Sequence, residues 1–220
     1  MTSYSANPFQ WPFQKRVLSS HGVRLEPMQE HHAEDLFVWS TESEIWQYMT
    51  FAKLDSRTAL DTWLKSAVQA NEAGTEMNFA IIDETSGRAV GGTSLYRVVP
   101  EHRRLELGKS WLGHLYRRTH INTVAKYLLL THAFEAVHAN RVELNTDGRN
   151  LRSQRAMERL GAVRDGLLRA HIIMRDGYVR DTANYSFIAT DWPSTKSKIE
   201  ELLPRDTQQN VLPVSSPHVP

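Results

Sequence analysis

The segment between residues 105 and 146 constrains the fold more than any other part of the chain. Apolar and polar side chains alternate from Leu105 to Leu112, which is typical of a β-strand. A short basic turn follows, and apolar residues then recur at steps of three and four from Ile121 to Ala136, which predicts a buried amphipathic helix. The next strand is predicted over 141–146. This order predicts a crossover whose helix begins at the end of a sheet strand.

The other elements follow from the same periodicities and from turn residues. Helices are predicted over 31–39, 57–73, 151–160 and 193–203, and strands over 23–28, 78–83, 89–99, 171–175 and 178–189. Gly74 and Gly161 are expected to end helices, and Asp176-Gly177 to form a hairpin turn. Pro27 predicts that its strand lies at a sheet edge. We expect an α/β fold with one domain over 16–203 and loose segments at 1–15 and 204–220.

In the strand that precedes the basic turn, we expect strict alternation of the side chains. One face is predicted to carry Leu105, Leu107, Lys109 and Trp111, and the other Glu106, Gly108 and Ser110.

Composition excludes several classes of protein. The chain is 40% hydrophobic and 23% charged, and it has no apolar run of membrane-spanning length. It has no cysteine, so disulfides, thiolate metal ligands and cysteine nucleophiles are excluded. The ten histidines show no metal-ligand spacing, and we expect no metal. No secretion signal is recognisable, so we expect a cytoplasmic protein and no membrane partner.

Charge is unevenly distributed along the chain. Residues 101–180 hold 15 Lys and Arg against 8 Asp and Glu, although the whole chain carries a net charge of only +1. A basic half favours an anionic ligand, but ordinary surface arginines produce the same count. The basic residues are not interleaved with aromatics in a recognisable module, so we expect no nucleic-acid partner.

The basic turn before the helix at 121–136 is the first candidate site. A helix N-terminus presents unpaired backbone N–H groups and a partial positive charge, which together suit a phosphate. We therefore predict that backbone donors, reinforced by two arginine side chains, bind a pyrophosphate here. The predicted residues are Arg117, Arg118, Thr119, His120, Ile121, Asn122 and Thr123.

Two motifs around this helix resemble those of a known family. The run from Arg117 to Asn122 is similar to a Gln/Arg-x-x-Gly-x-Gly/Ala pyrophosphate loop, with His120 and Asn122 in place of the small residues. Both tolerate left-handed backbone angles, which allows the loop to form. The run "NLRSQRAMERLGA", 150–162, is similar to Asn-x-x-Ser/Ala-x-x-x-Tyr-x-x-x-Gly-Phe, with Met157 in place of the tyrosine. These motifs, with "VRDGLLR" at 163–169, resemble the GNAT (GCN5-related) N-acetyltransferases of the RimJ/RimL-like branch.

The resemblance spans roughly residues 22–190 and carries several expectations. It implies the GNAT acyl-CoA N-acyltransferase fold, a central mixed, mostly antiparallel twisted sheet flanked by helices. It also implies acetyl-CoA as cosubstrate and an amine acceptor, either a protein N-terminus or a small amine. The protein is expected to be a monomer or a homodimer. A non-catalytic CoA-binding or regulatory protein is the alternative, because the tyrosine and the loop glycines are absent.

Transfer of an acetyl group to an amine needs a base, donors that face the thioester carbonyl, and a proton for the thiolate. The resemblance places Glu106 where related enzymes carry a catalytic glutamate; the alternative is a strand carboxylate paired with Arg103 or Arg104. The carbonyl donor is predicted to be the backbone of Leu112 or a neighbour, where the strand separates from the next. Ser153 is the predicted thiolate donor, and the alternative is a serine on the helix surface.

Three further residues around the helix at 151–160 are assigned by the same reasoning. Asn150 is predicted to cap this helix and to contact the pantetheine arm. Arg155 or Arg152 is predicted to approach the CoA 3′-phosphate, and the alternative is a solvated helix face. Aromatic residues before residue 112 suggest an acceptor pocket, although most are expected in the core. They are Trp39, Trp46, Tyr48, Trp63, Tyr96 and Trp111.

Overall fold

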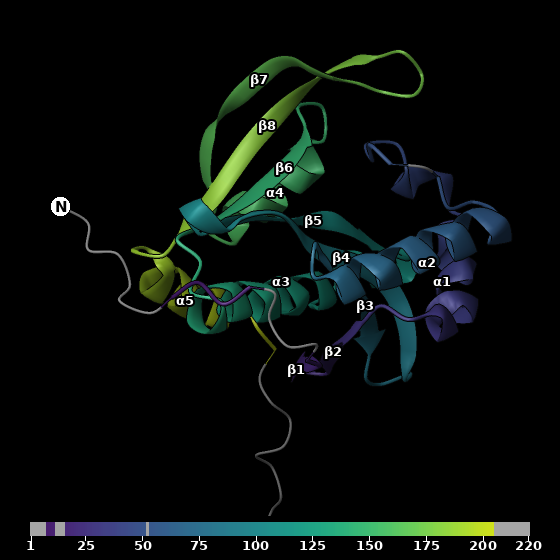
Figure 1. Cartoon of the computed structure of the whole chain (residues 1–220), viewed down its shortest axis with the longest axis horizontal. Helices are drawn as coiled ribbons and strands as arrows, with labels where there is room; N and C mark the ends of the chain where they lie inside the picture. Colours follow the sequence, from purple (N-terminus) through teal and green to yellow (C-terminus); the bar gives the residue numbers. More distant parts are fainter. Residues whose placement is uncertain (1–7, 12–15, 52, 205–220) are drawn as a thin grey trace, which may run out of the picture.

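The computed structural model describes residues 8–11, 16–51 and 53–204, which are built around one eight-stranded sheet (Figure 1). The strand order is β1-β2-β3-β4-β5-β6-β8-β7. Only β5 and β6 pair in parallel, so the predicted mixed, mostly antiparallel sheet is confirmed. The strands are β1 (Leu18–Ser20), β2 (Val23–Pro27), β3 (Met77–Asp83), β4 (Arg88–Val99), β5 (Arg104–Leu112), β6 (Arg141–Asp147), β7 (Val163–Ile173) and β8 (Val179–Ile188).

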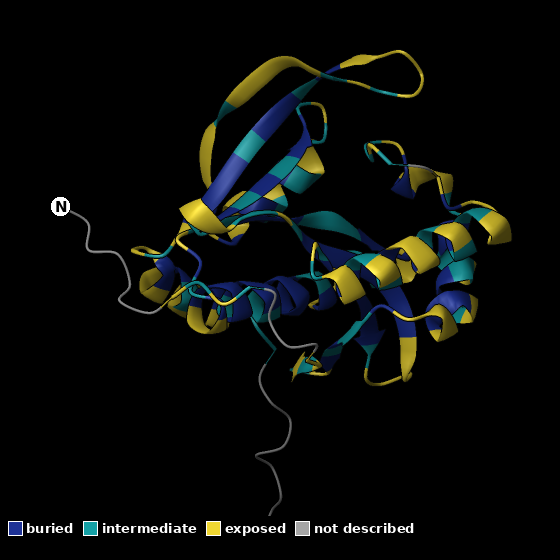
Figure 2. Ribbon diagram, viewed as in Figure 1, coloured by how far each residue is buried: buried dark blue, intermediate teal, exposed yellow. Residues whose placement is uncertain are grey.

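Helices cover both faces of the sheet, as alternate residues of β3 show. Ala80 and Ile82 pack in a cluster with α1 (Ala33–Ser40) and α2 (Arg57–Ala73). Ile81 lies in the other cluster, with side chains of α3 (Ile121–Thr131) and α5 (Trp192–Glu200). Figure 2 shows β3 and β4 as largely buried between these layers. The crossover from β5 to β6 therefore runs through α3, as the sequence predicted, and α4 (Leu151–Arg159) follows β6.

The predicted turn and cap residues are confirmed. Gly74 has φ 68° at the end of α2, and Gly161 has φ 91° just after α4. The Asn150 side chain accepts a hydrogen bond from the Ser153 N–H at 3.1 Å, which caps α4. Gly177 has φ 82° in the turn between β7 and β8. Each of these positions is fixed by local backbone geometry, which is why the sequence revealed them.

The structure differs from the predicted elements in three places. β7 begins at Val163, eight residues before the predicted strand, because most of it is an exposed edge without apolar alternation. The short strand β1 was missed. It pairs with β2, Leu18 opposite Leu25, so β2 is not the edge strand that Pro27 had suggested. The helix that starts at Ile121 changes to a π-helical turn over His132–Ala136.

We had predicted a loose segment over residues 1–15, but residues 8–11 are packed against the rest of the protein. Phe9 and Trp11 pack against the core, and the Trp11 Nε1–H donates to the Gly74 carbonyl at 2.8 Å. The Gln10 N–H donates to the Val137 carbonyl at 2.9 Å. Aromatic side chains in a terminal segment bury apolar area and so order it. The rest of the predicted loose segments, 1–7, 12–15 and 205–220, lies outside the described residues.

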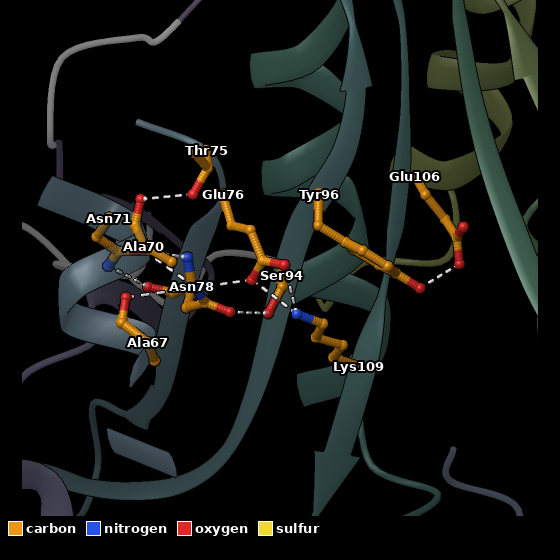
Figure 3. Close-up of polar contacts among 10 residues, drawn as sticks. All are labelled: Ala67, Ala70, Asn71, Thr75, Glu76, Asn78, Ser94, Tyr96, Glu106 and Lys109. Carbon is orange, nitrogen blue, oxygen red and sulfur yellow. Dashed lines mark hydrogen bonds and ion pairs between the residues drawn. The ribbon is translucent and has the colours of Figure 1, made fainter. Parts of the chain in front are cut away.

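The predicted strict alternation along β5 is interrupted by a bulge. Lys109 has φ 50°, and the register with β4 shifts between Gly92 and Ser94. An extra residue in one strand reverses the faces beyond it. Leu107 therefore packs in one cluster and Trp111 in the opposite one. The Lys109 side chain leaves the strand to bind Glu76, with Nζ 2.6 Å from Oε2 (Figure 3). The bulge lies at the point where β5 enters the candidate site.

Candidate functional site

The separation of β5 and β6 opens a large cavity in the described structure. The two strands pair only at Arg104–Glu106 with Arg141–Glu143. Beyond these pairs they diverge, and a cavity of ≈ 1020 Å³ is lined by β5, β6, the start of α3, α4, the segment 44–51 and β8. This is the size of a ligand site rather than a packing defect. Nine predicted site residues line it: Glu106, Leu112, Arg117, Arg118, Thr119, His120, Asn122, Asn150 and Ser153.

Three predicted residues do not line the cavity. Ile121 is buried in the core, and Thr123 is buried with its hydroxyl accepting from Arg159 Nη2 at 2.7 Å. Arg155 is exposed, whereas Arg152 and Arg159 of the same helix line the cavity. Arg152 and Arg159 are seven residues, about two turns, apart and so share one face, whereas Arg155 is rotated about 40 to 60° from both. The predicted contact of Arg155 with a phosphate stays a prediction.

The start of α3 has the backbone geometry expected of an anion site. The N-cap residue, His120, makes no side-chain cap, although Thr119 Oγ1 accepts from the Ile121 N–H at 3.3 Å. The N–H groups of Asn122 and Thr123 lie in the first turn, where intrahelical acceptors are absent. The left-handed residue of the preceding turn is Arg118, with φ 64°, whereas His120 is right-handed. His120 and Asn122 tolerate left-handed angles, but neither adopts one here. The loop forms with Arg118 in that conformation instead.

The two arginines of this loop have different environments. Arg117 Nη2 lies 2.7 Å from Glu42 Oε2 and Nη1 lies 3.2 Å from Glu44 Oε2. Its Nε–H also donates to the Leu112 carbonyl at 3.1 Å, so this guanidinium joins the loop to the segment after α1. Arg118 is exposed and forms no ion pair with any other described residue. Arg118 is therefore the cation that is available to an anion at this helix start.

The backbone of Leu112 faces the opening between β5 and β6. The next residue, Gly113, donates its N–H to the Val90 carbonyl of β4 at 2.9 Å. Successive N–H groups of a strand point to opposite sides, so the Leu112 N–H points away from β4. The Leu112 carbonyl accepts from Arg117 on that same side. This orientation is the one that a donor to a bound carbonyl requires.

Glu106 is a buried carboxylate at the wall of the cavity, with a side chain only 4% exposed. The Tyr96 hydroxyl donates to Oε1 (Figure 3), and Arg97 Nη1 lies 3.0 Å from Oε2. The ion pair expected under the structural alternative thus exists, but with Arg97. Arg104 pairs with Glu143 instead. Burial, and then the Glu106 charge, raise the pKa of Tyr96, so its phenol remains a hydrogen-bond donor at neutral pH.

The helix α4 brings Ser153 and Met157 to the cavity. Ser153 is half-buried and lines the cavity next to the capping residue Asn150. Met157 is buried at the position where the family pattern has tyrosine, so it offers no proton. Ser153 is the hydroxyl that α4 presents to the cavity, and its role as donor stays a prediction.

Sequence reasoning missed the buried cations of the cavity. Lys126 is 8% exposed, and its Nζ donates to the Ser110 hydroxyl at 2.7 Å. Burial lowers its pKa to about 7. The signal was a lysine among apolar residues of a buried helix. Arg180 of β8 is 4% exposed and lies at the same cavity, but no local pattern in the sequence marked it.

A small cluster outside the cavity bears on the metal prediction. Ligand atoms of Glu26, His31 and His32 lie within 4.8 Å of one another, which linear spacing did not suggest. His32 Nδ1 accepts from the Gln29 N–H at 3.1 Å, and Nε2 lies 3.1 Å from Glu26. Nδ1 is therefore engaged in capping the turn before α1, and Nε2 in the contact with Glu26 of β2. The absence of a functional metal stays a prediction.

Comparisons with known proteins match this fold. The family model described as an acetyltransferase (GNAT) domain matches residues 23–163. The crystal structure of a putative acetyltransferase from T. thermophilus is 35% identical, with a TM-score of 0.79, and covers 89% of this chain and 100% of its own. A GCN5-related N-acetyltransferase from Brucella melitensis is 28% identical, with a TM-score of 0.82 and coverage of 90% and 89%.

A curated relative from Bacillus subtilis (strain 168), the putative ribosomal N-acetyltransferase YdaF, is 25% identical over 180 residues. The match covers 78% of this chain and 92% of that protein. The chain belongs to the GNAT acetyltransferase family and is an acetyltransferase. No helix among the described residues is long and apolar enough to cross a membrane.

Proposed function

We propose that this protein transfers the acetyl group of acetyl-CoA to a primary amine by direct attack in a ternary complex. The observation that carries the proposal is that one cavity joins three features: the opening between β5 and β6, the start of α3 with its first-turn N–H groups, and Glu106. The acceptor is a protein N-terminus or a small amine, as in the RimJ/RimL-like branch. The relative that is a putative ribosomal N-acetyltransferase supports this choice, and the cytoplasm is the expected compartment.

Acetyl-CoA fits the cavity in one direction. Its pyrophosphate suits the N–H groups at the start of α3, next to the unpaired side chain of Arg118. The pantetheine arm then follows the opening between β5 and β6, within reach of Asn150 on α4. The thioester carbonyl faces the backbone N–H groups of β5 beyond the bulge, including that of Leu112. The reacting carbon is thereby directed toward Glu106.

The chemical step requires only residues that line this cavity. Glu106 accepts a proton from the attacking amine, directly or through water, while Tyr96 and Arg97 hold the carboxylate in place. A C–N bond forms as the C–S bond of the thioester breaks. The CoA thiolate leaves and takes a proton from Ser153, directly or through water. Solvent returns a proton to the Ser153 hydroxyl as Glu106 releases its own to solvent.

Acetyl-CoA is expected to stabilise the protein against thermal unfolding. A ligand at about 100 times its dissociation constant adds roughly 2.7 kcal/mol to the free energy of unfolding. The measurement is a melting scan with and without acetyl-CoA, followed by release of free thiol with a panel of amines. A folded protein that shows no shift at millimolar acetyl-CoA contradicts the assignment of the loop before α3. Binding without thiol release favours the non-catalytic alternative.

Substitution of Ser153 tests the proton donor. Ser153→Ala is expected to slow the chemical step by about 10-fold without weakening acetyl-CoA binding. The loss is modest because a thiolate with a pKa near that of free cysteine, ~8.5, leaves tolerably well without help. Single-turnover rates and acetyl-CoA titrations separate the two effects. Met157→Tyr in the same chain restores an acid at the family's position and is expected to recover the rate. Full activity of Ser153→Ala assigns the proton to water.

A further inference from the structure

Arg180 is a buried cation that forms no ion pair with any of the described residues. It lies on β8, is 4% exposed and lines the cavity. Among the described residues, its guanidinium has one hydrogen bond, a long one of 3.4 Å from Nη1 to the Tyr48 carbonyl. Its Nε is buried without a hydrogen-bond partner, and it belongs to none of the ion pairs of the described chain. An unpaired buried charge is costly, so a fold that keeps one has a reason outside its own contacts.

The nearest carboxylates are already engaged by other groups. Asp147 lies 2.8 Å from Arg149, and Glu106 lies 3.0 Å from Arg97. Both act on Arg180 only through longer-range electrostatics. Because each carboxylate has its own cation, Arg180 contributes a net positive charge to the wall. Burial lowers the pKa of Arg180, but an arginine remains protonated at neutral pH.

A second unpaired polar group lies beside Arg180. Thr182 is two residues further along β8, so its side chain is on the same face of the strand. It is fully buried, lines the cavity, and has a hydroxyl without a hydrogen-bond partner. Two buried donors without acceptors on one wall are what an anion-binding subsite presents to its ligand.

We propose that Arg180 and Thr182 bind an anionic group, a carboxylate or a phosphate, of the acceptor amine. This inference rests on the proposed acetyl transfer and names the class of acceptor: a small amine that carries its own negative charge. The phosphates of acetyl-CoA are assigned to the other end of the cavity, at the start of α3. Arg180 instead lines the same cavity as Glu106 and interacts electrostatically with its carboxylate. The acceptor's anion therefore binds Arg180 while its amine faces Glu106.

The same geometry argues against polycationic acceptors. Arg180 and Arg97 both border the acceptor end of the cavity. The charge of Arg97 is cancelled by Glu106, so the charge of Arg180 leaves this wall net positive. A polyamine or an aminoglycoside antibiotic brings several positive charges to this positive wall and is repelled. An acidic small amine gains from the same field. The bond changes remain those of acetyl transfer: one C–N bond forms and one C–S bond breaks.

The first test measures anion binding without any assumption about the acceptor. The protein is first saturated with CoA, so that the loop before α3 is occupied. It is then titrated calorimetrically with inorganic phosphate and, separately, with acetate. Saturable binding is expected for at least one of them. Arg180→Gln is expected to weaken it at least 10-fold, Arg180→Lys to weaken it less, and Thr182→Val to weaken it several-fold. Arg88→Gln, at an exposed residue paired with Asp35, is the charge control and is expected to bind as wild type does.

The outcomes separate the two proposals. If CoA itself does not bind, the proposed function fails and this inference fails with it. If CoA binds but neither anion does, or if Arg180→Gln binds them as wild type does, the subsite is wrong and the proposed function stands. If Arg180→Gln does not fold, Thr182→Val and the wild-type titrations decide. Phosphate and acetate affinities together show which anion the subsite prefers.

The second test uses matched acceptors. Thiol release is measured with amino acids against their amides, with phosphoethanolamine against ethanolamine, and with spermidine. The charged member of at least one pair is expected to be the better substrate. Arg180→Gln is expected to raise the KM for this charged substrate on the order of 100-fold, with a smaller change in kcat. The KM for the neutral substrate of the pair is expected to change little. If the neutral amines or spermidine are acetylated as efficiently as the charged amines, the inference is overturned, while the proposed acetyl transfer stands.

Discussion

Glu106→Gln is expected to lower turnover by ~10²-fold or more at neutral pH, because it removes the proposed base and keeps its size. The amide oxygen still accepts the hydrogen bond from the Tyr96 hydroxyl. Arg97 loses its ion pair, but its side chain is 61% exposed, so water replaces the partner. The fold is therefore expected to persist. Acetyl-CoA affinity is expected to hardly change, because the proposed phosphate contacts are at the other end of the cavity.

The chain offers a matched control for this substitution. Glu143 lies beside Glu106 on β6, in register, and is held by Arg104 and Arg141. It does not line the cavity. Glu143→Gln removes the same charge one strand away and is expected to leave turnover within a few-fold of wild type. Equal losses in the two variants, or turnover near wild type in Glu106→Gln, would assign Glu106 to a structural ion pair.

Lys126→Met is expected to stabilise the protein at neutral pH. The Lys126 ammonium is buried without a carboxylate partner in the described chain, and burial lowers its pKa from 10.5 to about 7. Each pKa unit corresponds to about 1.4 kcal/mol, so the buried ammonium costs on the order of 4 kcal/mol at pH 7. Methionine has a similar length and no charge. We expect the free energy of unfolding to rise by about 2 to 4 kcal/mol, since the Ser110 hydroxyl loses one donor.

The pH dependence of this effect identifies its cause. Between pH 7 and 10.5 the unfolded chain binds the lysine proton more tightly than the folded chain does, so wild-type stability gains from Lys126 as pH rises. The Lys126→Met advantage is therefore expected to shrink steadily across this range. Denaturant unfolding at several pH values measures it, with Lys65→Met on the exposed face of α2 as control. If the stability advantage of Lys126→Met is the same at every pH, it reflects packing alone. If Lys126→Met is less stable than wild type at neutral pH, the buried-charge account is refuted.

Much of the site was predictable because its signals are local in the chain. Asn150 caps α4 and Gly74 ends α2, as expected from residue type and position alone. The order of strand, basic turn and amphipathic helix predicted the crossover through α3. Glu106, Ser153 and most of the loop before α3 do lie at one cavity. Which loop residue is left-handed could not be read from residue type, because it is Arg118 and neither His120 nor Asn122.

By itself, the sequence determined the elements, their order and the chemistry that their ends offer, because caps, turns and periodicity act over a few residues. Only the tertiary structure decided which charges are neutralised, because an ion pair joins residues that are remote in sequence. Arg117 was expected to serve a phosphate and is paired with Glu42, 75 residues away. Glu106 is held by Arg97 across the β4–β5 pairing. Arg180 has no such partner among the described residues, and this depends on how β8 lies beside the opening of β5 and β6.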